Sequence, residues 1–389
     1  MRLEESWGLL GMSYKLEDIC DYVKEKIDIS LIDENTYIST ENMLPDKGGI
    51  TEASSLPSAD KTQAFKAGDV LVSNIRPYFK KIWYSTFDGG CSNDVLVFRA
   101  KEGVSKRFLY YVLADDTFFS YSMSTAKGTK MPRGDKKALM KYDVPNISYE
   151  EQVKIASVLD VIDKKIFVNK EINDNLLQQA QNIFTQEFID IDDIPEGWKE
   201  SSLLGIADYL NGLAMQKFRP KDDEHGLPVL KIKELRQGSC NANSELCSPS
   251  IKPEYIVHDG DVIFSWSGSL LVDLWCGGTC GLNQHLFKVT SSTYDKWFYY
   301  AWTNHHLQKF IAIAADMATT MGHIKREELS KAVVLIPSKS DYERIGGLLS
   351  PLYDLVVANR IESRKLAALR DALLPQLMSG QIDVSEVEL

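Results

Sequence analysis

The feature that most constrains this 389-residue chain is an internal duplication with a period of about 190 residues. Four pairs of segments carry it: LEDICDY at 16–22 with LLGIADY at 203–209 (offset 187), AGDVLVS at 67–73 with DGDVIFS at 259–265 (offset 192), CSNDVLVF at 91–98 with CGLNQHLF at 280–287 (offset 189), and FLYY at 108–111 with WFYY at 297–300 (offset 189). One unit has therefore been copied in tandem, and the same fold is expected twice.

Each copy divides into a globular part and a long helix. Short β-rich runs alternate with turn sequences over roughly the first 150 residues of a copy, and short helices are expected near 106–119 and 295–313. Pro195 and Gly197 end the first long helix and open the second copy. The predicted organisation is a first globular domain at 1–149, a spacer helix at 150–193, a second globular domain at 194–339, a second spacer helix at 340–380, and an acidic tail at 381–389.

Both long helices carry apolar residues at the alternating four- and three-residue spacing of a coiled-coil seam. The first seam is Ile155, Leu159, Ile162, Ile166, Asn169, Asn173, Leu176, Ala180 and Ile183, and the second, at an offset of 190, is Ile345, Leu349, Leu352, Val356, Asn359, Ser363, Leu366, Arg370 and Leu373. Arg370 interrupts the second seam, and Leu369 is the candidate to replace it. The predicted fold class is α+β: two tandem β-rich α/β domains separated by a long antiparallel two-helix coiled coil with pseudo-two-fold symmetry.

Asn169 and Asn359 stand at the midpoints of the two seams. In an antiparallel pair whose opposed residue numbers sum to about 528, these two residues meet at the crossing point. A polar residue in a seam penalises wrong registers, because a mispaired amide is buried without a partner. The prediction is that the two asparagines fix the register of the spacer, and a separation well beyond ~10 Å would contradict it. The alternative is that they face solvent on irregular helices.

The formal net charge of −11 disfavours nucleic acid only if the charges are evenly spread. They are not: residues 126–141 hold six bases against one acid, 61–81 hold five against one, and 150–193 hold four against ten. The chain therefore offers basic surfaces.

No run of 18 apolar residues predicts a membrane span. The six cysteines show no metal-binding or disulfide spacing, so we expect reduced thiols, no metal, and a cytoplasmic protein.

The chain resembles the DNA-specificity (S) subunit of a type I restriction–modification system over nearly its whole length. The residues that carry the resemblance are GDVLVS at 68–73 and its echo GDVIFS at 260–265, the segment 151–155 that opens the first helix, 194–198, and LLPQLMSG at 373–380. Asp341, Tyr342 and Glu343 depart from it, since the family has an acid–Gln pair there, as the first copy does at Glu151 and Gln152.

The resemblance implies a chain without chemistry of its own. Each globular domain is expected to read one half of a bipartite site in double-stranded DNA. The helices are expected to set the spacer and to dock two methyltransferase (M) subunits, through which restriction (R) subunits join. S-adenosylmethionine would be bound by the methyltransferase and ATP by the restriction subunit, with no cofactor on this chain. The residues agree, because neither a GxxxxGK[ST] phosphate loop nor a methyltransferase-type glycine motif followed by (D/N)PP(Y/F) is present.

Two segments of the first copy are candidates for touching DNA, because cations, amides and aromatic rings on loops suit phosphate and base-edge contacts. The first contributes Ser73, Asn74, Arg76, Tyr78, Lys80 and Lys81, and the second contributes Lys127, Thr129, Lys130, Arg133, Lys136 and Lys137. The alternative for each is an ordinary solvated loop.

In the second copy the basic candidates are Lys217, Arg219, Lys221, Lys231 and Lys233. Ser265, Trp266 and Ser267 match the first loop without its charge, so we expect more shape and apolar readout there. His323, Lys325 and Arg326 occupy the position equivalent to the basic loop of the first copy.

Apolar residues off the seams predict two exposed stripes that suit helices of a partner protein. They are Phe167, Ile172, Leu177, Phe184, Leu355, Ile361 and Leu374. The alternative is that the globular domains cover them.

Two other functions stay open from the residues alone, a non-catalytic scaffold with duplicated sensor domains and a self-contained DNA-modification enzyme.

Overall fold

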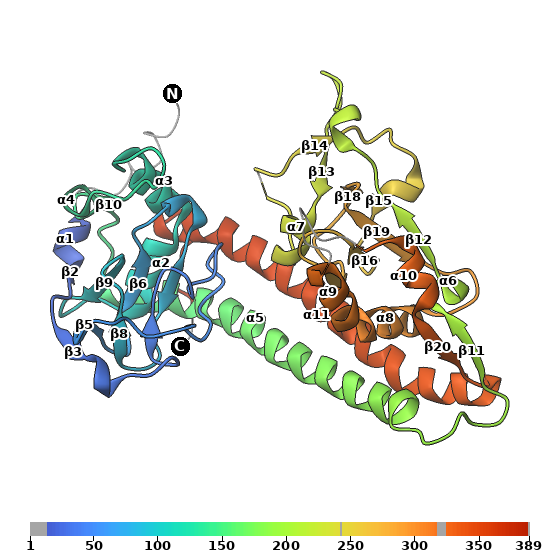
Figure 1. The fold of residues 1–389 in the computed structure, drawn as a ribbon. Coiled ribbons are helices and arrows are strands. Elements are labelled where there is room, and N and C mark those ends of the chain that lie inside the picture. The colour runs from blue at the N-terminus through green and yellow to red at the C-terminus, as the bar shows by residue number, and fades with distance from the viewer. Residues whose placement is uncertain (1–13, 242, 317–323, 388–389) are drawn as a thin grey trace. The chain divides into compact units, whose positions relative to one another are not determined.

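The computed structural model describes residues 14–241, 243–316 and 324–387. It divides into two compact units, Met1–Lys164 with Ala367–Leu389 and Lys165–Leu366. Each long helix is shared between the units, because the first unit contains the start of one helix and the end of the other. We call these unit 1 and unit 2 and describe each by itself (Figure 1).

Unit 1 is built on two four-stranded sheets. The first has the order β2 (Cys20–Tyr22), β9 (Val95–Ala100), β6 (Val70–Ser73) and β7 (Ile82–Tyr84), all antiparallel. The second has the order β3 (Lys26–Asp28), β5 (Lys61–Phe65), β8 (Gly89–Cys91) and β4 (Tyr37–Ile38), with β4 parallel to β8. β6 is buried along its whole length, which explains why it reads as continuous apolar residues rather than as an alternation.

The helices of unit 1 begin where side chains cap them. Ser105 accepts a hydrogen bond from the backbone N–H of Phe108 at the start of α2 (Lys106–Ala114), and Asp115 accepts from Thr117 at the start of α3 (Asp116–Ser124). The remaining elements are α1 (Leu16–Ile19), α4 (Lys136–Leu139), and the strand pair β1 (Tyr14–Lys15) and β10 (Asp143–Val144). α2 and α3 pack on the first sheet and form with it the main core of unit 1.

Unit 2 repeats this plan. Its first sheet has the order β12 (Asp208–Asn211), β19 (Leu286–Thr290), β16 (Val262–Ser265) and β17 (Leu271–Leu274). Its second has the order β14 (Leu246–Cys247), β13 (Leu227–Leu230), β18 (Cys280–Leu282) and β15 (Ile256–Val257), with β13 parallel to β18. The remaining elements are β11 (Lys199–Ser202), β20 (Val333–Ile336), α6 (Leu203–Ile206), α7 (Ile232–Gln237), α8 (Lys296–His305), α9 (Leu307–Asp316) and α10 (Arg326–Lys331).

The sheet register corrects one of the sequence offsets. Val95 lies opposite Ser73 in unit 1, and Leu286 lies opposite Ser265 in unit 2. Ser73 and Ser265 are 192 apart, as the sequence predicted, but Val95 and Leu286 are 191 apart. The offset of 189 for β9 and β19 was therefore wrong. Matching CSNDVLVF to CGLNQHLF aligned similar letters, whereas backbone pairing fixes which residues are equivalent.

The repeated Gly-Asp-Val motif has a structural role. Gly68 and Gly260 take positive φ angles of 93° and 84°, which favour glycine. The next residue turns its carboxylate back onto the chain: Asp69 accepts from Lys66 N at 2.8 Å, and Asp261 accepts from His258 N at 2.8 Å. Asp69 also binds Arg99, and Asp261 binds Lys288 at 2.8 Å. The motif thus fixes the turn that starts the central strand of each first sheet.

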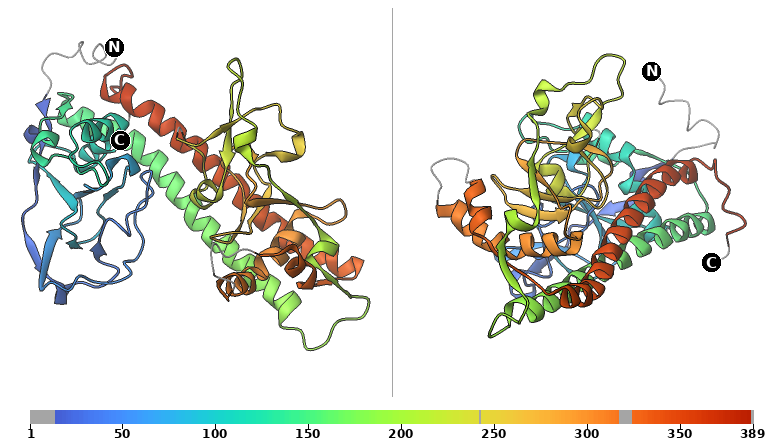
Figure 2. Two further views of the ribbon diagram at one scale, coloured as in Figure 1. Left: turned by 45° about the horizontal axis from the view of Figure 1, so that its top comes forward. Right: turned by 90° about the vertical axis from the view of Figure 1, so that its right-hand side faces the viewer.

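Two long helices, α5 (Tyr149–Phe184, continued by a π-turn at Thr185–Ile189) and α11 (Lys339–Met378), follow the two globular parts. Within unit 2 they run antiparallel, since Lys165 pairs with Glu362 and Glu187 with Arg344 (Figures 1 and 2). Ser148 and Glu151 cap the start of α5 reciprocally, and Ser338 accepts from Asp341 N at the start of α11.

Three expectations about the helix surfaces were wrong. Arg370 is not a flaw in the seam: its side chain is 13% exposed and donates to Asp163 at 2.8 Å, while Leu369, the expected substitute, is 48% exposed. Phe184 and Leu374 are not exposed either, because each belongs to the core of a globular part. The alternative that the domains cover them holds at these two positions, whereas Phe167, Ile172 and Leu355 are exposed.

The C-terminal segment beyond α11 packs on unit 1. Val384 is buried in its core, and Ile382 and Val387 lie against the same cluster. Lys154 on α5 donates to the backbone oxygen of Ser385 at 2.7 Å. The acidic tail expected at 381–389 is therefore held, over its described part, by apolar contacts.

Candidate DNA interface

In unit 1 the first predicted segment forms the connection from β6 to β7. Ser73 and Asn74 are buried, so they support the loop from inside. Beyond them Arg76 (φ 50°) and Lys80 (φ 49°) take left-handed backbone conformations on either side of a 3-10 turn, Pro77–Phe79. Tyr78 is exposed at the tip. The loop therefore presents an aromatic ring and cations from a tightly bent backbone.

A neighbouring turn braces this loop. Asp46 and Lys47 are also left-handed, and with Arg76 and Lys80 they are the non-glycine residues of positive φ in the described chain. Asp46 N donates to Phe79 O at 2.8 Å, and Lys47 N donates to Lys80 O at 3.0 Å. Strained non-glycine backbone gathers at functional sites when its surroundings hold it in place. The strain of unit 1 is concentrated at the loop that the sequence selected for DNA.

The buried side chain of Lys47 fixes this turn in place. The Lys47 side chain is 6% exposed, and its amine lies 3.2 Å from Asp116 on α3 and 3.3 Å from Asp371 on α11. No sequence pattern predicted this role for Lys47. Its chemistry could not be read from a Pro-Asp-Lys turn, because both of its acidic partners are distant in the chain.

The second predicted segment lies beside the first. Lys127 and Arg133 exchange backbone hydrogen bonds at 2.9 and 3.0 Å, so 127–133 is a closed loop. Arg76 N donates to Pro132 O at 2.8 Å, and Gly134 N approaches Asn74 O at 3.4 Å. The structure therefore brings both segments to one place, although they are some fifty residues apart in the sequence.

The cations of this surface differ in availability. Lys80 pairs with Asp116 at 2.7 Å, Arg133 with Asp94 at 3.1 Å, and Lys127 with Asp135 at 2.5 Å. Lys81 donates to Thr40 O at 2.6 Å, and burial lowers its pKa. Lys130, Lys136 and Lys137 form no ion pair with any described residue. These three side chains are available to pair with a phosphate, whereas Lys80 and Arg133 would first have to break their ion pairs with Asp116 and Asp94.

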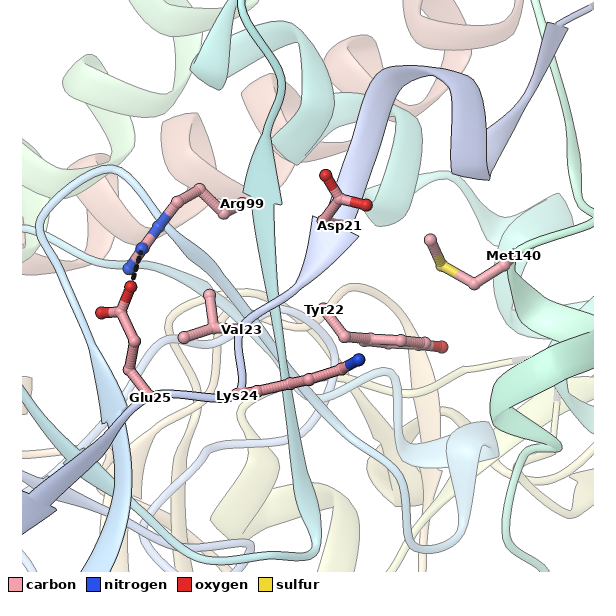
Figure 3. Close-up of a pocket in the computed structure, with 7 residues that line it drawn as sticks. All are labelled: Asp21, Tyr22, Val23, Lys24, Glu25, Arg99 and Met140. Carbon is pink, nitrogen blue, oxygen red and sulfur yellow. Dashed lines mark hydrogen bonds and ion pairs between the residues drawn. The ribbon is translucent and has the colours of Figure 1, made fainter.

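Two open pockets lie in unit 1. One, of about 390 Å³, is lined mainly by hydroxyl and amide side chains near Asp94, including Ser39, Thr40, Asn42, Ser54 and Ser55. This polar wall was not predicted, since Ser, Thr and Asn are also the residues that turns require. The other, of about 490 Å³, is bordered by Asp21, Lys24, Glu25 and Arg99 (Figure 3). Arg99 is committed there to Asp69 and Glu25.

In unit 2 the equivalent loop is polar and aromatic. Ser265 is buried and donates to Ser269 O at 2.9 Å. Trp266 Nε1 donates to Asn211 Oδ1 at 3.0 Å, and Ser267 Oγ lies 3.1 Å from His285 Nδ1. Asn211 and His285 were missed by the sequence analysis, although the Asn-Gln-His run at 283–285 was visible as a polar break between two apolar runs.

The other predicted cations of unit 2 form no single cluster. Arg219 and Lys231 converge on Glu245, which lowers the pKa of that carboxyl. Lys217, Lys221 and Lys233 lie on exposed turns and on α7, without an ion pair among described residues. Arg326 donates to Tyr209 O at 3.1 Å, and Lys325 precedes α10. His323 lies outside the described residues.

The two spacer asparagines meet in unit 2. Asn169 Nδ2 lies 3.5 Å from Asn359 O and donates to Glu362 Oε2 at 2.7 Å. Asn359 Nδ2 donates to Asn173 Oδ1 at 2.9 Å. The side-chain amide pair thus joins Asn359 to Asn173, one helical turn from the pairing that the sequence predicted. That the cluster sets the register stays a prediction.

Neither a metal centre nor a membrane helix is found in the described parts of the chain. No group of three or more His, Cys, Asp or Glu side chains there could hold a metal ion. No described helix is long and apolar enough to cross a bilayer.

Comparison with known proteins identifies the family. The model of the type I restriction modification DNA specificity domain matches twice, at residues 12–178 and 195–369. A type I restriction enzyme specificity subunit (MjaIX) of Methanocaldococcus jannaschii is 25% identical over 74% of this chain and 71% of its own length. A second (MjaVIII) from that organism is 22% identical over 100% of this chain and 95% of its own length.

A solved structure agrees on the fold. The type I restriction–modification S subunit from M. genitalium is 13% identical, covers 94% of this chain and 96% of its own, and superposes with a TM-score of 0.55. The predicted fold class is confirmed by this likeness, and the predicted internal repeat by the double match of the family model. The chain belongs to the type I restriction-modification DNA specificity family and carries two copies of the family's domain.

Proposed function

We propose that each unit reads one half of a bipartite DNA sequence, with the loop after β6 in unit 1 and the loop after β16 in unit 2 as reading elements. Membership of the family supports the general function, sequence-specific DNA recognition in a type I restriction–modification system. The observation that carries the half-site proposal is the duplication itself. Two copies of one reader within a chain mirror a target made of two parts.

The chemistry of the two loops suits different modes of contact. The unit 1 loops combine an exposed tyrosine with free lysines at 130, 136 and 137, so phosphate attraction supplies affinity there. The unit 2 loop offers Trp266, Asn211 and His285, whose ring faces and amide or imidazole groups suit base edges and stacking. We infer that the first half-site is bound with the stronger salt dependence.

The long helices are proposed to set the distance between half-sites and to dock two methyltransferase subunits. The exposed side chains of Phe167, Ile172 and Leu355 support this, since apolar residues on a helix pair suit further helices. In this proposal the chain is non-catalytic and cytoplasmic. The methyltransferase brings S-adenosylmethionine, and a restriction subunit brings ATP.

A domain exchange tests the half-site proposal. The globular part of unit 1 is replaced by that of a relative with a known target, the chain is expressed with its methyltransferase subunits, and methylated adenines are mapped across the genome. One half of the methylated sequence should change and the other half should stay. A change in both halves would refute independent reading. Methyl transfer by the chain alone would instead favour a self-contained enzyme.

A further inference from the structure

Unit 2 contains a cavity of about 330 Å³ between the helix pair and the globular part. Its walls come from α5 (Leu177, Gln181), β17 (Leu271–Asp273), α8 (Tyr300, Asn304) and α11 (Tyr353, Arg360). The volume lies within the range of small-molecule sites. Most of the lining side chains are polar, so the cavity is not a packing defect of an apolar core.

Two tyrosines in this cavity lack partners. Tyr300 and Tyr353 are each 6% exposed, and their rings meet edge-on with centroids 4.9 Å apart. Neither hydroxyl makes a hydrogen bond to any residue that the structure describes. The rings are buried, but neither hydroxyl oxygen is among the fully enclosed polar atoms that lack a partner, so both hydroxyls reach the open side of the cavity. Both hydroxyls are therefore available to donate to an acceptor that enters the cavity.

Arg360 adds a partly used cation. Its Nη1 donates to Asp273 Oδ1 at 2.7 Å and to Leu274 O at 3.1 Å. No described residue accepts from its other nitrogens. A guanidinium has five N–H donors, so Arg360 can serve a further acceptor.

In unit 1, charged side chains surround the tyrosine that is equivalent to Tyr300. There Tyr111, the sequence equivalent of Tyr300, donates to Asp160 at 2.7 Å and to Asp163 at 2.8 Å. Arg107 and Arg370 neutralise these two carboxylates. At the helix offset of 190, Asp160 corresponds to Ser350, Asp163 to Tyr353, and Arg370 to Ala180. At these positions unit 2 has neither carboxylate and neither arginine, with Lys296 in place of Arg107, but it keeps the tyrosine. The carboxylate that lines its cavity is Asp273 of β17, which pairs with Arg360.

We propose that this cavity, which we name the Tyr300–Tyr353 cavity, binds a carboxylate group supplied from outside the chain. The two hydroxyls and the free N–H groups of Arg360 are its donors, taking the role that Tyr111 and the arginines have in unit 1. The carboxylate comes either from a small free acid or from an acidic side chain of a protein that packs on the helices. Nothing in the proposed DNA recognition requires this site.

The test uses the full chain and a matched pair of probes, succinate and its neutral analogue succinamide, at constant ionic strength. Calorimetric titration should show saturable binding of succinate and much weaker binding of succinamide. Hydrogen bonds to a charged group contribute about 1.5–3 kcal/mol, so Tyr300→Phe and Tyr353→Phe should each weaken succinate binding about tenfold or more. Tyr299→Phe, a buried tyrosine of the same helix outside the cavity, should leave it unchanged.

Repeating the titration on the complex with methyltransferase subunits separates the two sources. Succinate binding that persists indicates a free acid, and binding that disappears indicates an acidic side chain of the partner. The proposal is overturned if succinate and succinamide behave alike on the free chain. It is equally overturned if the two Tyr→Phe variants bind succinate as the unchanged chain does, or if guanidinium ion binds the cavity in place of succinate.

Discussion

Arg370 offers the sharpest test of how unit 1 is held together. Its guanidinium donates to Asp163, whose other oxygen accepts from Tyr111 at 2.8 Å. The two side chains of the ion pair are only 13% and 19% exposed. Burial opposes the charge on Arg370, but Asp163 and Asp371 outweigh it and raise the pKa of the guanidinium. The pair joins α11 to α5, and Asp163 links both to α2 by accepting from Tyr111.

Arg370→Met keeps most of the side-chain volume and removes the charge. Removing one partner of a buried ion pair typically costs 3–5 kcal/mol, because the other charge is left uncompensated. Tyr111 still donates to Asp163, and Arg107 stays 3.8 Å away, so we expect the low end, about 3 kcal/mol. For a domain of about 150–250 residues this lowers the unfolding midpoint by roughly 6–12 °C.

Thermal unfolding gives the size of the effect, and hydrogen exchange measured on peptides places it. Protection should fall in the α2 and α5 peptides of unit 1 and stay unchanged in α8 of unit 2. A double-mutant cycle with Asp163→Asn should give a coupling energy of about 1–3 kcal/mol. Leu369→Ala, the exposed neighbour, should change stability by about 0.5 kcal/mol or less. A loss below about 1 kcal/mol for Arg370→Met, or a coupling near zero, would refute the reasoning.

Three further predictions test other parts of the structure. Gly347→Ala should raise the free energy of unfolding by about 0.5–1 kcal/mol, since a helical Cβ there meets nothing within 4 Å. Gly346→Ala should instead lower the melting temperature, because its Cβ would lie 2.9 Å from Trp297 Nε1. Equal effects of the two variants in calorimetry would contradict this. Lys130→Glu and Lys136→Glu should weaken DNA binding alike for target and non-target sequences and flatten the dependence of log K on log salt, and a loss confined to the target would point to base contacts instead. Burial lowers the pKa of His306 below 6.5, so the unfolded chain takes up the proton first, and the free energy of unfolding of unit 2 should fall as the pH drops below about 6.5. His306→Phe keeps a ring beside Trp302 and should reduce the slope of unfolding free energy against pH, measured by denaturation from pH 7 to pH 5. An unchanged slope would assign the pH dependence to other groups.

The sequence by itself determined the duplication, the tandem α+β plan, and the two long helices with asparagines in their seams. These features are periodic or repeated, and periodic burial leaves a periodic pattern of apolar residues. The two candidate DNA-binding segments of unit 1 were also selected from local composition, because cations and turn residues are visible one by one. Whether those residues bind DNA is still a prediction.

The tertiary structure alone decided what depends on partners distant in the chain. The sequence predicted no role for Lys47 and a seam defect at Arg370. Only their acidic partners, Asp116, Asp371 and Asp163, show that these two residues brace unit 1. Phe184 and Leu374 fit an exposed stripe by spacing, yet the globular parts cover them. The Tyr300–Tyr353 cavity is likewise invisible in the sequence, because its walls come from α5, β17, α8 and α11, which are far apart in the chain. A hydrogen bond or a void is a property of two or more distant segments at once, and no local pattern records it.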